Sequence, residues 1–318
     1  EILVKLEKKH PIVGKILEYR SLSKLKSTYV DALPELVNPR DKRIHTSYNQ
    51  AVAATGRLSS NNPNLQSIPI RTEKGRERRK AFIPRNDEYT LLAADYSQVE
   101  LRIIAHLSKD KNMVDAFNQG LDIHTATASK VYGIPLEEVG KDLRRNAKTV
   151  NFGLVYGISA FGLSERINIP RKEAKEIIDN YFIQYAGVKQ YMDKSIEFAR
   201  ENGFVETIMG RRRYLKDINS GNAIVRGFAE RNAINAPIQG SSADMIKIAM
   251  IDVFREMERL KMKSKMILQV HDELVFDAKL DELDTLKAIV LEKMKNAIKI
   301  AVPVVVDMNT GNNWLEAH

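Results

Sequence analysis

Carboxylates stand at the ends of two apolar segments of the chain. Asp95 ends the run Thr90–Asp95, and His271, Asp272 and Glu273 separate the apolar segments 266–270 and 274–278. Mg²⁺ takes one or two protein carboxylates and leaves its other positions to water and substrate phosphates. A pair of such ions about 3.5–4 Å apart can activate an attacking oxygen and stabilise a leaving one. Either acidic site alone is typical of a surface strand end or a polar turn, but together they favour a site for a hard divalent cation.

A second pattern lies in the segment DLRRNAKTVNFGLVYG. Arg144, Lys148, Phe152 and Tyr156 recur every four residues, so on a helix they form one slowly winding stripe roughly 18 Å long. Two cations followed by two aromatic rings suit a ligand with a polyanionic end and a flat end, such as a nucleoside triphosphate. The alternative is a half-exposed helix whose rings are buried and whose cations are solvated.

The composition narrows the choice of partner and chemistry. Lys and Arg number 50 against 41 Asp and Glu, and the formal charge of +9 favours a polyanionic partner such as nucleic acid. The 318 residues include no Cys, which excludes a disulfide framework, a Cys-ligated metal and a thiol nucleophile. The sequence also lacks a GxxxxGK(S/T) loop, an HExxH pair and a GxSxG elbow. No run of residues is apolar enough to span a bilayer.

The elements that must position these residues follow from the apolar periods. Residues 90–108 predict a strand, a turn and then a helix. From Asp110 to Gly227 the chain has helical periods with Gly or Pro at the joints and no convincing strand, which predicts a long helical insertion. Beyond it we expect a helix over 242–260, a hairpin over 266–278, a helix over 283–300 and a strand over 302–308. An α+β layer should therefore carry the chemistry.

Three motifs make the chain recognisable at this point. DYSQVELR (95–102), RRNAKTVNFGLVYG (144–157) and QVHDE (269–273) resemble, in order and with suitable separations, the three polymerase motifs of family A DNA polymerases of the bacterial polymerase I type. TGRLSSNNPNLQSIPIR, GRRRYLKDI, FAERNAINAPIQGSSAD and NNWLEAH are similar to the same family. The resemblance covers essentially the whole chain.

The resemblance implies an α+β, right-hand polymerase fold with an antiparallel-sheet palm, all-helical fingers and a truncated helical thumb. Residues 1–33 would be the thumb remnant, 34–108 the first part of the palm, 109–227 the fingers and 228–318 the second part of the palm. The chain begins at Glu1, without Met, inside a helical pattern, so we expect it to continue a longer protein.

The implied activity is DNA-directed DNA polymerisation. The primer 3′-hydroxyl would attack the α-phosphate of a dNTP and pyrophosphate would leave, with two Mg²⁺ ions as cofactors and Mn²⁺ as a possible substitute. Asp95 and Asp272 would hold both ions together with the main-chain carbonyl of Tyr96, and Glu273 would be a nearby, secondary carboxylate. Lys148 would donate a proton to pyrophosphate.

The resemblance also implies the substrate-binding residues. Glu100 would close off the sugar 2′ position, Phe152 is the form that disfavours dideoxynucleotides, and Tyr156 would stack at the insertion site. The predicted dNTP-binding residues are Gln98, Glu100, His124, Arg144, Lys148, Phe152 and Tyr156. The predicted DNA-binding residues are Arg57, Asn64, Gln66, Arg231, Asn235, Gln239 and His271. Because a polymerase must be indifferent to sequence, these DNA contacts should be to the backbone and minor groove.

The expected partners are primer–template DNA and dNTPs, with no membrane, and the expected state is a monomer in a bacterial-type cytoplasm. Members of the bacterial type carry a 5′ nuclease, an exonuclease-like domain and a full thumb. The chain starts near the last thumb helix, so we expect no nuclease activity, weak salt-sensitive DNA binding and low processivity.

Three other interpretations of the sequence stay open. A single-subunit RNA polymerase has a similar arrangement of carboxylates in its palm, although Glu100 and KTVNFGLVYG favour a DNA enzyme. A non-catalytic fragment that binds primer–template without turnover is the alternative from another class. A fragment that misfolds for want of missing domains is the third.

Overall fold

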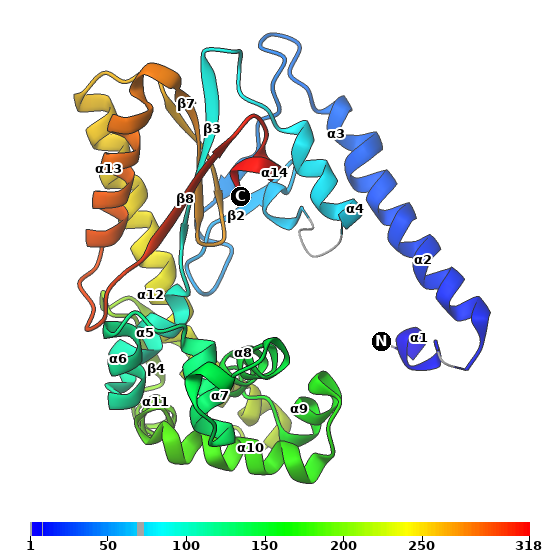
Figure 1. Cartoon of the computed structure of the whole chain (residues 1–318), viewed down its shortest axis with the longest axis vertical. Coiled ribbons are helices and arrows are strands. Elements are labelled where there is room, and N and C mark those ends of the chain that lie inside the picture. Colours follow the sequence, from blue (N-terminus) through cyan, green and yellow to red (C-terminus); the bar gives the residue numbers. More distant parts are fainter. Residues whose placement is uncertain (1, 8, 69–72) are drawn as a thin grey trace.

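A four-stranded antiparallel sheet lies at the centre of the larger part of the molecule (Figure 1). The computed structural model describes residues 2–7, 9–68 and 73–318. The strands are β3 (Tyr89–Tyr96), β6 (Lys265–Val270), β7 (Glu273–Lys279) and β8 (Val306–Gly311), in the order β6-β7-β3-β8. The expected strand and the expected hairpin, which are far apart in sequence, are therefore neighbours.

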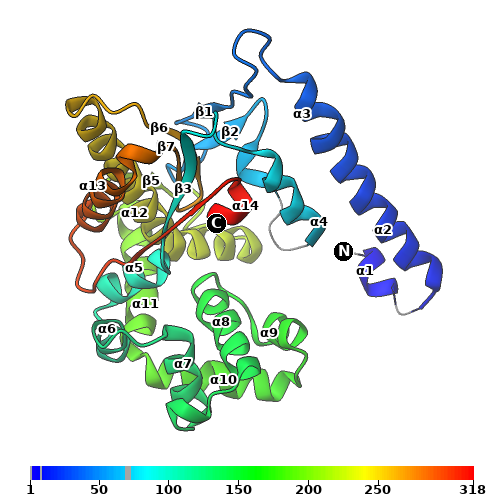
Figure 2. The same cartoon turned by 45° about the horizontal axis from the view of Figure 1, so that its top comes forward.

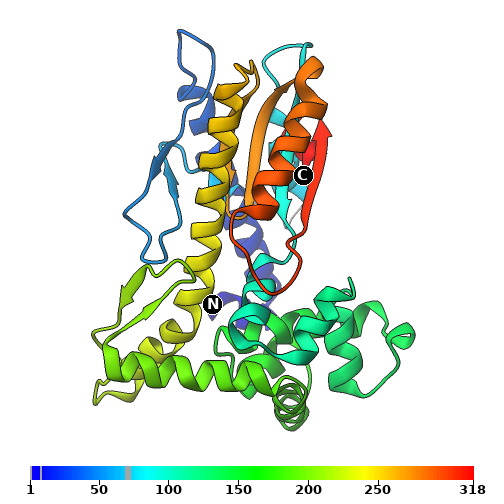
Figure 3. The ribbon, with the colours of Figure 1, turned by 90° about the vertical axis from the view of Figure 1, so that its left-hand side faces the viewer.

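Both faces of β3 are covered, which explains its continuous apolar sequence. Leu92 and Ala94 point into the main core, whereas Leu91 and Ala93 pack with Trp314 in a second cluster on the opposite face. The helices of the main core include α5 (Val99–Ser108), α12 (Ala223–Arg259) and α13 (Leu283–Asn296). Figure 3 shows α12 and α13 running along the sheet. The second cluster lies on the opposite face.

A group of helices forms the lower part of the molecule in Figures 1 and 2. They are α6 (Lys111–Asn118), α7 (Ile123–Tyr132), α8 (Lys141–Val155), α9 (Ala160–Ile167), α10 (Arg171–Gln184) and α11 (Ala186–Asn202), with a short 3₁₀ helix over Leu136–Glu138. Asp110, Asp122 and Ser159 cap three of them by accepting a hydrogen bond from a main-chain amide of the first turn.

One part of the segment 109–227 is not helical, so the expectation of all-helical fingers is wrong there. The strands β4 (Phe204–Glu206) and β5 (Arg212–Tyr214) form an antiparallel hairpin. Gly203 and Gly210 adopt positive φ at its start and in its turn. Three-residue strands are too short to show an alternating pattern, which is why the sequence did not reveal them.

The first residues form a helical arm that projects from the body (Figure 2). It consists of α1 (Ile2–Leu6), α2 (Pro11–Leu25), a π-helical turn over Lys26–Asp31 and α3 (Ala32–Glu35). Within α2 only Val13 and Leu25 are buried. Tyr29 attaches the arm to the body by donating a hydrogen bond of 2.8 Å from its hydroxyl to the carbonyl of Ser67.

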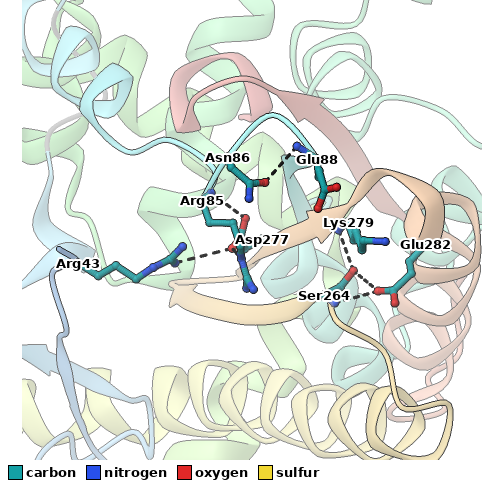
Figure 4. A network of polar contacts seen from close by, with 8 residues as sticks. All are labelled: Arg43, Arg85, Asn86, Glu88, Ser264, Asp277, Lys279 and Glu282. Atoms are coloured by element: carbon teal, nitrogen blue, oxygen red, sulfur yellow. Dashed lines mark hydrogen bonds and ion pairs between the residues drawn. The ribbon is translucent and has the colours of Figure 1, made fainter. Parts of the chain in front are cut away.

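The loop-rich segment 40–85 is held by polar contacts with the sheet. It contains β1 (Ser47–Asn49), β2 (Ser59–Asn61), a 3₁₀ turn over Leu65–Ser67, α4 (Glu73–Arg76) and a 3₁₀ turn over Glu77–Ala81. The buried carboxylate of Asp277 accepts a 2.7 Å hydrogen bond from Arg85 Nε and lies 3.7 Å from Arg43 Nη1 (Figure 4). Tyr48 and Gln269 also exchange hydrogen bonds. The end of the motif TGRLSSNNPNLQSIPIR, residues 69–71, lies outside the described residues.

Several element bounds differ from those expected. The helix expected over 242–260 begins at Ala223, continues through Pro237, and crosses the expected domain boundary at 227/228. Proline removes one helical hydrogen bond, and the burial of Pro237 and its neighbours compensates for this loss. The helix expected to reach residue 300 ends at Asn296, and the last strand begins at Val306 because Pro303 cannot donate to a sheet. The chain ends in α14 (Trp314–Ala317).

Candidate active site

The two predicted metal-binding carboxylates lie side by side. Asp95 is the penultimate residue of β3, and Asp272 lies in the two-residue turn that joins β6 to β7. The amide of Tyr96 donates a 3.2 Å hydrogen bond to the main-chain carbonyl of Asp272, which fixes the turn against β3. His271 completes the turn with φ 56°, a left-handed conformation that is uncommon outside glycine. The turn thus brings Asp272 within hydrogen-bonding reach of the Asp95 carboxylate.

This site concentrates negative charge. Burial, and then the neighbouring carboxylates of Asp272, Glu273 and Asp307, raise the pKa of Asp95 to about 8. Burial raises the pKa of Asp272 as well. Asp95 Oδ1 is buried without a hydrogen-bond partner. Buried acceptors are nearly always satisfied in proteins, so this oxygen is free to accept a partner from outside the chain, and a hard cation is one such partner.

Tyr96 can contribute only its main chain to such a cation. Its ring lies on the opposite face of the sheet, where the hydroxyl donates a 2.7 Å hydrogen bond to the carbonyl of Met294. Burial raises the pKa of this hydroxyl. The placement agrees with the predicted role of the Tyr96 carbonyl, and two carboxylates with a carbonyl form an oxygen donor set that suits Mg²⁺.

Glu273 lies directly opposite Asp95 in the β3–β7 register. Both of its oxygens are engaged by the last helical turn of the chain. Oε1 accepts a 2.7 Å hydrogen bond from the indole Nε1 of Trp314, and Oε2 is hydrogen-bonded to Nδ1 of His318. Glu273 is therefore close to the site but turned away from it. The sequence analysis did not single out Trp314, His318 or Asp307, which sits opposite Asp95 on β8.

A polar cluster joins three of the predicted residues around Glu100. Arg57 lies 2.5 Å from Glu100 Oε1, and the Tyr156 hydroxyl donates a hydrogen bond to Oε2. Burial, then the charge of Glu100, raises the pKa of Tyr156, and the side chain of Gln239 also hydrogen-bonds to it. Gln98 precedes this cluster as the N-cap of α5, with φ 54° and no side-chain capping bond. The cluster ties α5, the C-terminal end of α8 and α12 to the loop that carries Arg57.

The predicted triphosphate-binding residues gather where α7 meets α8. Arg144 Nη2 and Nε lie 2.7 and 3.0 Å from the two oxygens of Asp122. Nδ1 of His124 is 3.1 Å from Nδ2 of Asn151, and its ring centroid is 5.9 Å from that of Phe152. The sequence analysis missed the partners Asp122 and Asn151, because no local pattern marks a contact between two helices.

The pKa values of two side chains in this cluster, His124 and Asp122, are strongly shifted. Burial lowers the pKa of His124 to about 4 against the opposing charge of Asp122, and the positive charges of Lys148 and Arg144 lower it further. Although burial alone would raise it, hydrogen bonds from Arg144 and Thr125 lower the pKa of Asp122 to about 2. At neutral pH His124 is therefore a neutral donor beside two cations, a combination that can bind phosphate oxygens.

The predicted DNA-binding residues fall in two places. Arg231, Asn235 and Gln239 share one face of α12 because they are four residues apart. Arg231 packs so closely against Gly157 that a Cβ there would meet its side chain at 2.6 Å. Asn235 Oδ1 is buried without a hydrogen-bond partner.

The remaining predicted DNA-binding residues are near the turn of the hairpin. Arg57, Gln66 and His271 line one small pocket with Gln269. Gln66 Nε2 donates a 2.9 Å hydrogen bond to Gln269 Oε1. Asn64 is not part of this pocket, since its side chain accepts a 3.0 Å hydrogen bond from the Gln66 amide and caps a 3₁₀ turn.

A large cavity lies elsewhere in the structure. It has a volume of about 950 Å³ between the helical arm and the sheet, and Tyr29, Phe82, Leu91 and Trp314 are among its lining residues. Neither Asp95 nor Asp272 lines it. The acidic site therefore lies apart from this cavity.

The chain belongs to DNA polymerase family A, whose model matches residues 1–316. Its relatives include the DNA polymerase I of Chloroflexus aurantiacus, 52% identical over 317 residues, and that of Pseudomonas aeruginosa, 55% identical over 303 residues. These alignments cover 99% and 95% of this chain but 33% of each relative. The chain thus spans about a third of the length of the curated relatives it matches.

A solved structure agrees with the fold. The POL domain of Pol1 from M. smegmatis, in complex with DNA primer–template and dNTP, matches with a TM-score of 0.94 and 46% identity over 99% of this chain and 56% of that one. The expected α+β, right-hand polymerase fold with an antiparallel-sheet palm is confirmed, with the β4–β5 hairpin as the exception in the expected fingers. The division into palm, fingers and thumb at the expected boundaries stays a prediction.

Proposed function

We propose that this chain is a DNA-directed DNA polymerase that transfers a dNMP from a dNTP to a primer 3′-hydroxyl and releases pyrophosphate. The observation that carries the proposal is the Asp95–Asp272 pair, because both carboxyl groups have a raised pKa and one oxygen of Asp95 has no hydrogen-bond partner. Membership of family A supports the same reaction.

Asp95, Asp272 and the Tyr96 carbonyl would hold two Mg²⁺ ions, with Mn²⁺ as a substitute. Bound there, such ions supply charge neutralisation at the reacting phosphate and lower the pKa of the attacking hydroxyl. The carboxylates would also fix the position of the primer end, because Asp95 belongs to the buried strand β3 and the turn that carries Asp272 is hydrogen-bonded to it.

The nucleotide would bind across α7 and α8. Arg144, Lys148 and neutral His124 would hold the triphosphate, and Lys148 would give a proton to the leaving pyrophosphate. Phe152 and Tyr156 would face the sugar and base. Glu100, held by Arg57 and Tyr156, would occupy the space that a ribose 2′-hydroxyl needs.

Primer–template DNA would lie over the hairpin turn and α12. Arg57, Gln66, His271, Arg231, Asn235 and Gln239 would contact its backbone and minor groove, with Asn64 supporting the loop that carries Gln66. These contacts suit an enzyme that must accept every sequence.

We also propose that the chain is a monomer and acts in a bacterial cytoplasm. Light scattering of the purified chain measures its mass and so tests the monomer. No helix among residues 2–7, 9–68 and 73–318 is long and apolar enough to cross a membrane.

Primer extension with Mg²⁺ and dNTPs tests the function. Asp95→Asn and Asp272→Asn should each slow extension by about 10³-fold, since a metal ligand contributes several kcal/mol to the transition state. Asp193→Asn, an exposed aspartate on α11, is the matched control and should extend at the parental rate. Binding of primer–template without extension by the parent chain would contradict the proposal and favour a non-catalytic DNA-binding role.

A further inference from the structure

We propose that Asn151 and Thr127 are positioning residues of the triphosphate site. They hold His124 in the tautomer that carries its proton on Nε2, so that this nitrogen donates a hydrogen bond to a phosphate oxygen. The inference rests on the proposed function, because it takes the triphosphate of a dNTP as the ligand of His124. It assigns a task to two buried polar side chains that do not themselves bind substrate.

A series of hydrogen bonds leads from the core of the helical region to His124. Asn151 Nδ2 lies 3.1 Å from His124 Nδ1, and the Thr127 hydroxyl donates a 3.1 Å hydrogen bond to Asn151 Oδ1. The Tyr185 hydroxyl lies 3.1 Å from the same Thr127 oxygen. We call these four residues the His124 network. Three of them are fully buried and His124 is only 2% exposed, so bulk water does not compete for these contacts.

The network has one direction in which every hydroxyl hydrogen finds an acceptor. Among the described residues, Thr127 is the only hydrogen-bond partner of the Tyr185 hydroxyl, so Tyr185 donates to Thr127. Burial raises the pKa of Tyr185 to about 12, and its hydroxyl therefore keeps this hydrogen at neutral pH. Thr127 passes its own hydrogen to Oδ1 of Asn151, which turns the amide nitrogen toward His124. The opposite orientation of the amide would give Thr127 two donors and leave its own hydrogen without an acceptor.

The state of His124 follows from this direction. Because Asn151 Nδ2 can only donate, His124 Nδ1 accepts, and the proton of a neutral imidazole is then on Nε2. The ring is neutral at pH 7, since burial lowers the pKa of His124 to about 4. Among the described residues Nε2 has no hydrogen-bond partner, yet it is not sealed from solvent. This N–H is therefore left for a ligand, and the nearby charges of Lys148 and Arg144 favour an anion.

The other tautomer would be unsuited to the same ligand. With its proton on Nδ1, His124 would turn an unprotonated nitrogen toward a phosphate oxygen, so that two acceptors would face each other. Only the fraction of molecules with the proton on Nε2 is competent, and the apparent affinity falls in proportion to that fraction. If both tautomers were equally populated, binding would weaken about twofold. The network prevents this loss by selecting one tautomer before the ligand arrives.

Nitrogen-15 NMR of the full chain at pH 7 tests the tautomer directly, because long-range proton–nitrogen spectra distinguish protonated from unprotonated ring nitrogens. The signals of His124 are those that disappear in His124→Gln. In the parent we expect a protonated Nε2 and an unprotonated Nδ1. Thr127→Val removes the hydroxyl that orients the Asn151 amide and should populate both tautomers, whereas Thr127→Ser keeps the hydroxyl and should give the parental spectrum.

Binding of inorganic triphosphate, measured by isothermal titration calorimetry, shows the consequence for the ligand. Thr127→Val should weaken it about twofold, and Thr127→Ser should restore it. In a His124→Gln background Thr127→Val should cause no further loss, because a glutamine amide has no tautomer to select. The control Thr149→Val makes the same change on α8, at a hydroxyl that bonds the Arg145 carbonyl, and should leave both the His124 spectrum and the affinity unchanged.

Three results would overturn the proposal. They are a proton on Nδ1 of His124 in the parent, a parental spectrum in Thr127→Val, and an equal loss of affinity from Thr127→Val with and without His124. The spectrum of the parent and the Thr127→Ser variant keep the proposal testable if Thr127→Val does not fold.

Neither measurement requires turnover, so primer extension by the parent distinguishes this inference from the proposed function. A parent that extends primers while His124 carries its proton on Nδ1 would leave the polymerase function standing and reject the inference. A parent that shows the expected tautomer and the expected loss in Thr127→Val, but does not extend primers, would do the reverse.

Discussion

Carboxylates lie toward both ends of the paired strands β3 and β7, and they differ in burial and in whether a cation accompanies them. At one end, Asp277 is 1% exposed, accepts a 2.7 Å hydrogen bond from Arg85 and lies 3.7 Å from Arg43. At the other end, neither Asp95 nor Asp272 has an ion-pair partner among the described residues, and one oxygen of Asp95 has no hydrogen bond.

The difference separates a structural charge from a functional one. Arg43 and Arg85 belong to the loop-rich segment 40–85, so neutralising Asp277 also fastens that segment to the sheet (Figure 4). The Asp95 site has no cationic partner among the described residues, so ionisation of Asp95 is costly there unless a cation binds from outside. Buried charge without a partner costs stability, which is the usual condition of a functional site.

Replacing one carboxylate at a time should change the free energy of unfolding in opposite directions at the two ends. Asp277→Asn should lower the free energy of unfolding by about 2–3 kcal/mol, because it leaves Arg85 and Arg43 without their anion, and the partial exposure of Arg85 moderates the loss. Asp95→Asn should instead raise it by about 1 kcal/mol, because burial and the neighbouring carboxylates disfavour ionisation of Asp95 in the folded chain, whereas Asn carries no such cost. Urea unfolding in EDTA measures both. A destabilised Asp95→Asn would show that the two ends are alike.

A buried titratable group can also avoid the cost of an unpaired charge by remaining neutral, as His124 does. Its pKa is lowered to about 4, below the ordinary value of 6.5, mainly by burial. The unfolded chain gains a proton near pH 6.5 but the folded chain does not, so stability falls as the pH drops from about 6.5 toward 4. The loss attributable to His124 should reach about 2 kcal/mol at pH 5.

Unfolding at pH 7 and pH 5 measures this loss, and His124→Gln should remove it. The exposed His45, which pairs with Asp41 at the surface, provides the control His45→Gln, which should leave the His124 contribution in place. An unchanged pH dependence in His124→Gln would contradict the assignment.

Added metal should sharpen the contrast between the two carboxylate sites. At a Mg²⁺ concentration ten times its Kd, binding to the folded chain adds about 1.4 kcal/mol to the free energy of unfolding. Thermal unfolding with and without Mg²⁺ should show this gain in the parent and in Asp277→Asn, but not in Asp95→Asn. A gain that persists in Asp95→Asn would place the metal elsewhere.

The smallest effect is expected where a carboxylate is paired at the surface. Asp31 and Lys26 lie 2.7 Å apart with half or more of each side chain exposed. Asp31→Asn should change the free energy of unfolding by no more than about 0.5 kcal/mol. Measured beside Asp277→Asn, it tests whether burial, and not pairing alone, determines the cost of losing a partner.

The parts of the site that follow local sequence could be predicted. The apolar run before Asp95, the hairpin around Asp272 and the four-residue spacing of Arg144, Lys148 and Phe152 all depend on neighbours within one element. The structure has the corresponding strand, hairpin and helix. Tyr156 ends that helix as its C-cap, and there its hydroxyl reaches Glu100.

The parts that depend on distant partners could not be predicted in the same way. Nothing near Glu273 indicates that Trp314 and His318 would bind it, and nothing near Arg144 indicates Asp122. Such pairs arise from how elements pack, and a change of register or crossing angle would separate them. The short β4–β5 hairpin was missed for a different reason, since three residues carry too little periodicity.

The helical arm has a consequence for how the molecule fluctuates. Because α2 buries only Val13 and Leu25, few contacts oppose its local opening, whereas β3 is enclosed on both faces. Opening free energies within one protein range from near zero to the full free energy of unfolding. Amide hydrogens of α2 should exchange with solvent long before those of β3, and any partner that covers the arm would be registered first as slowed exchange along α2.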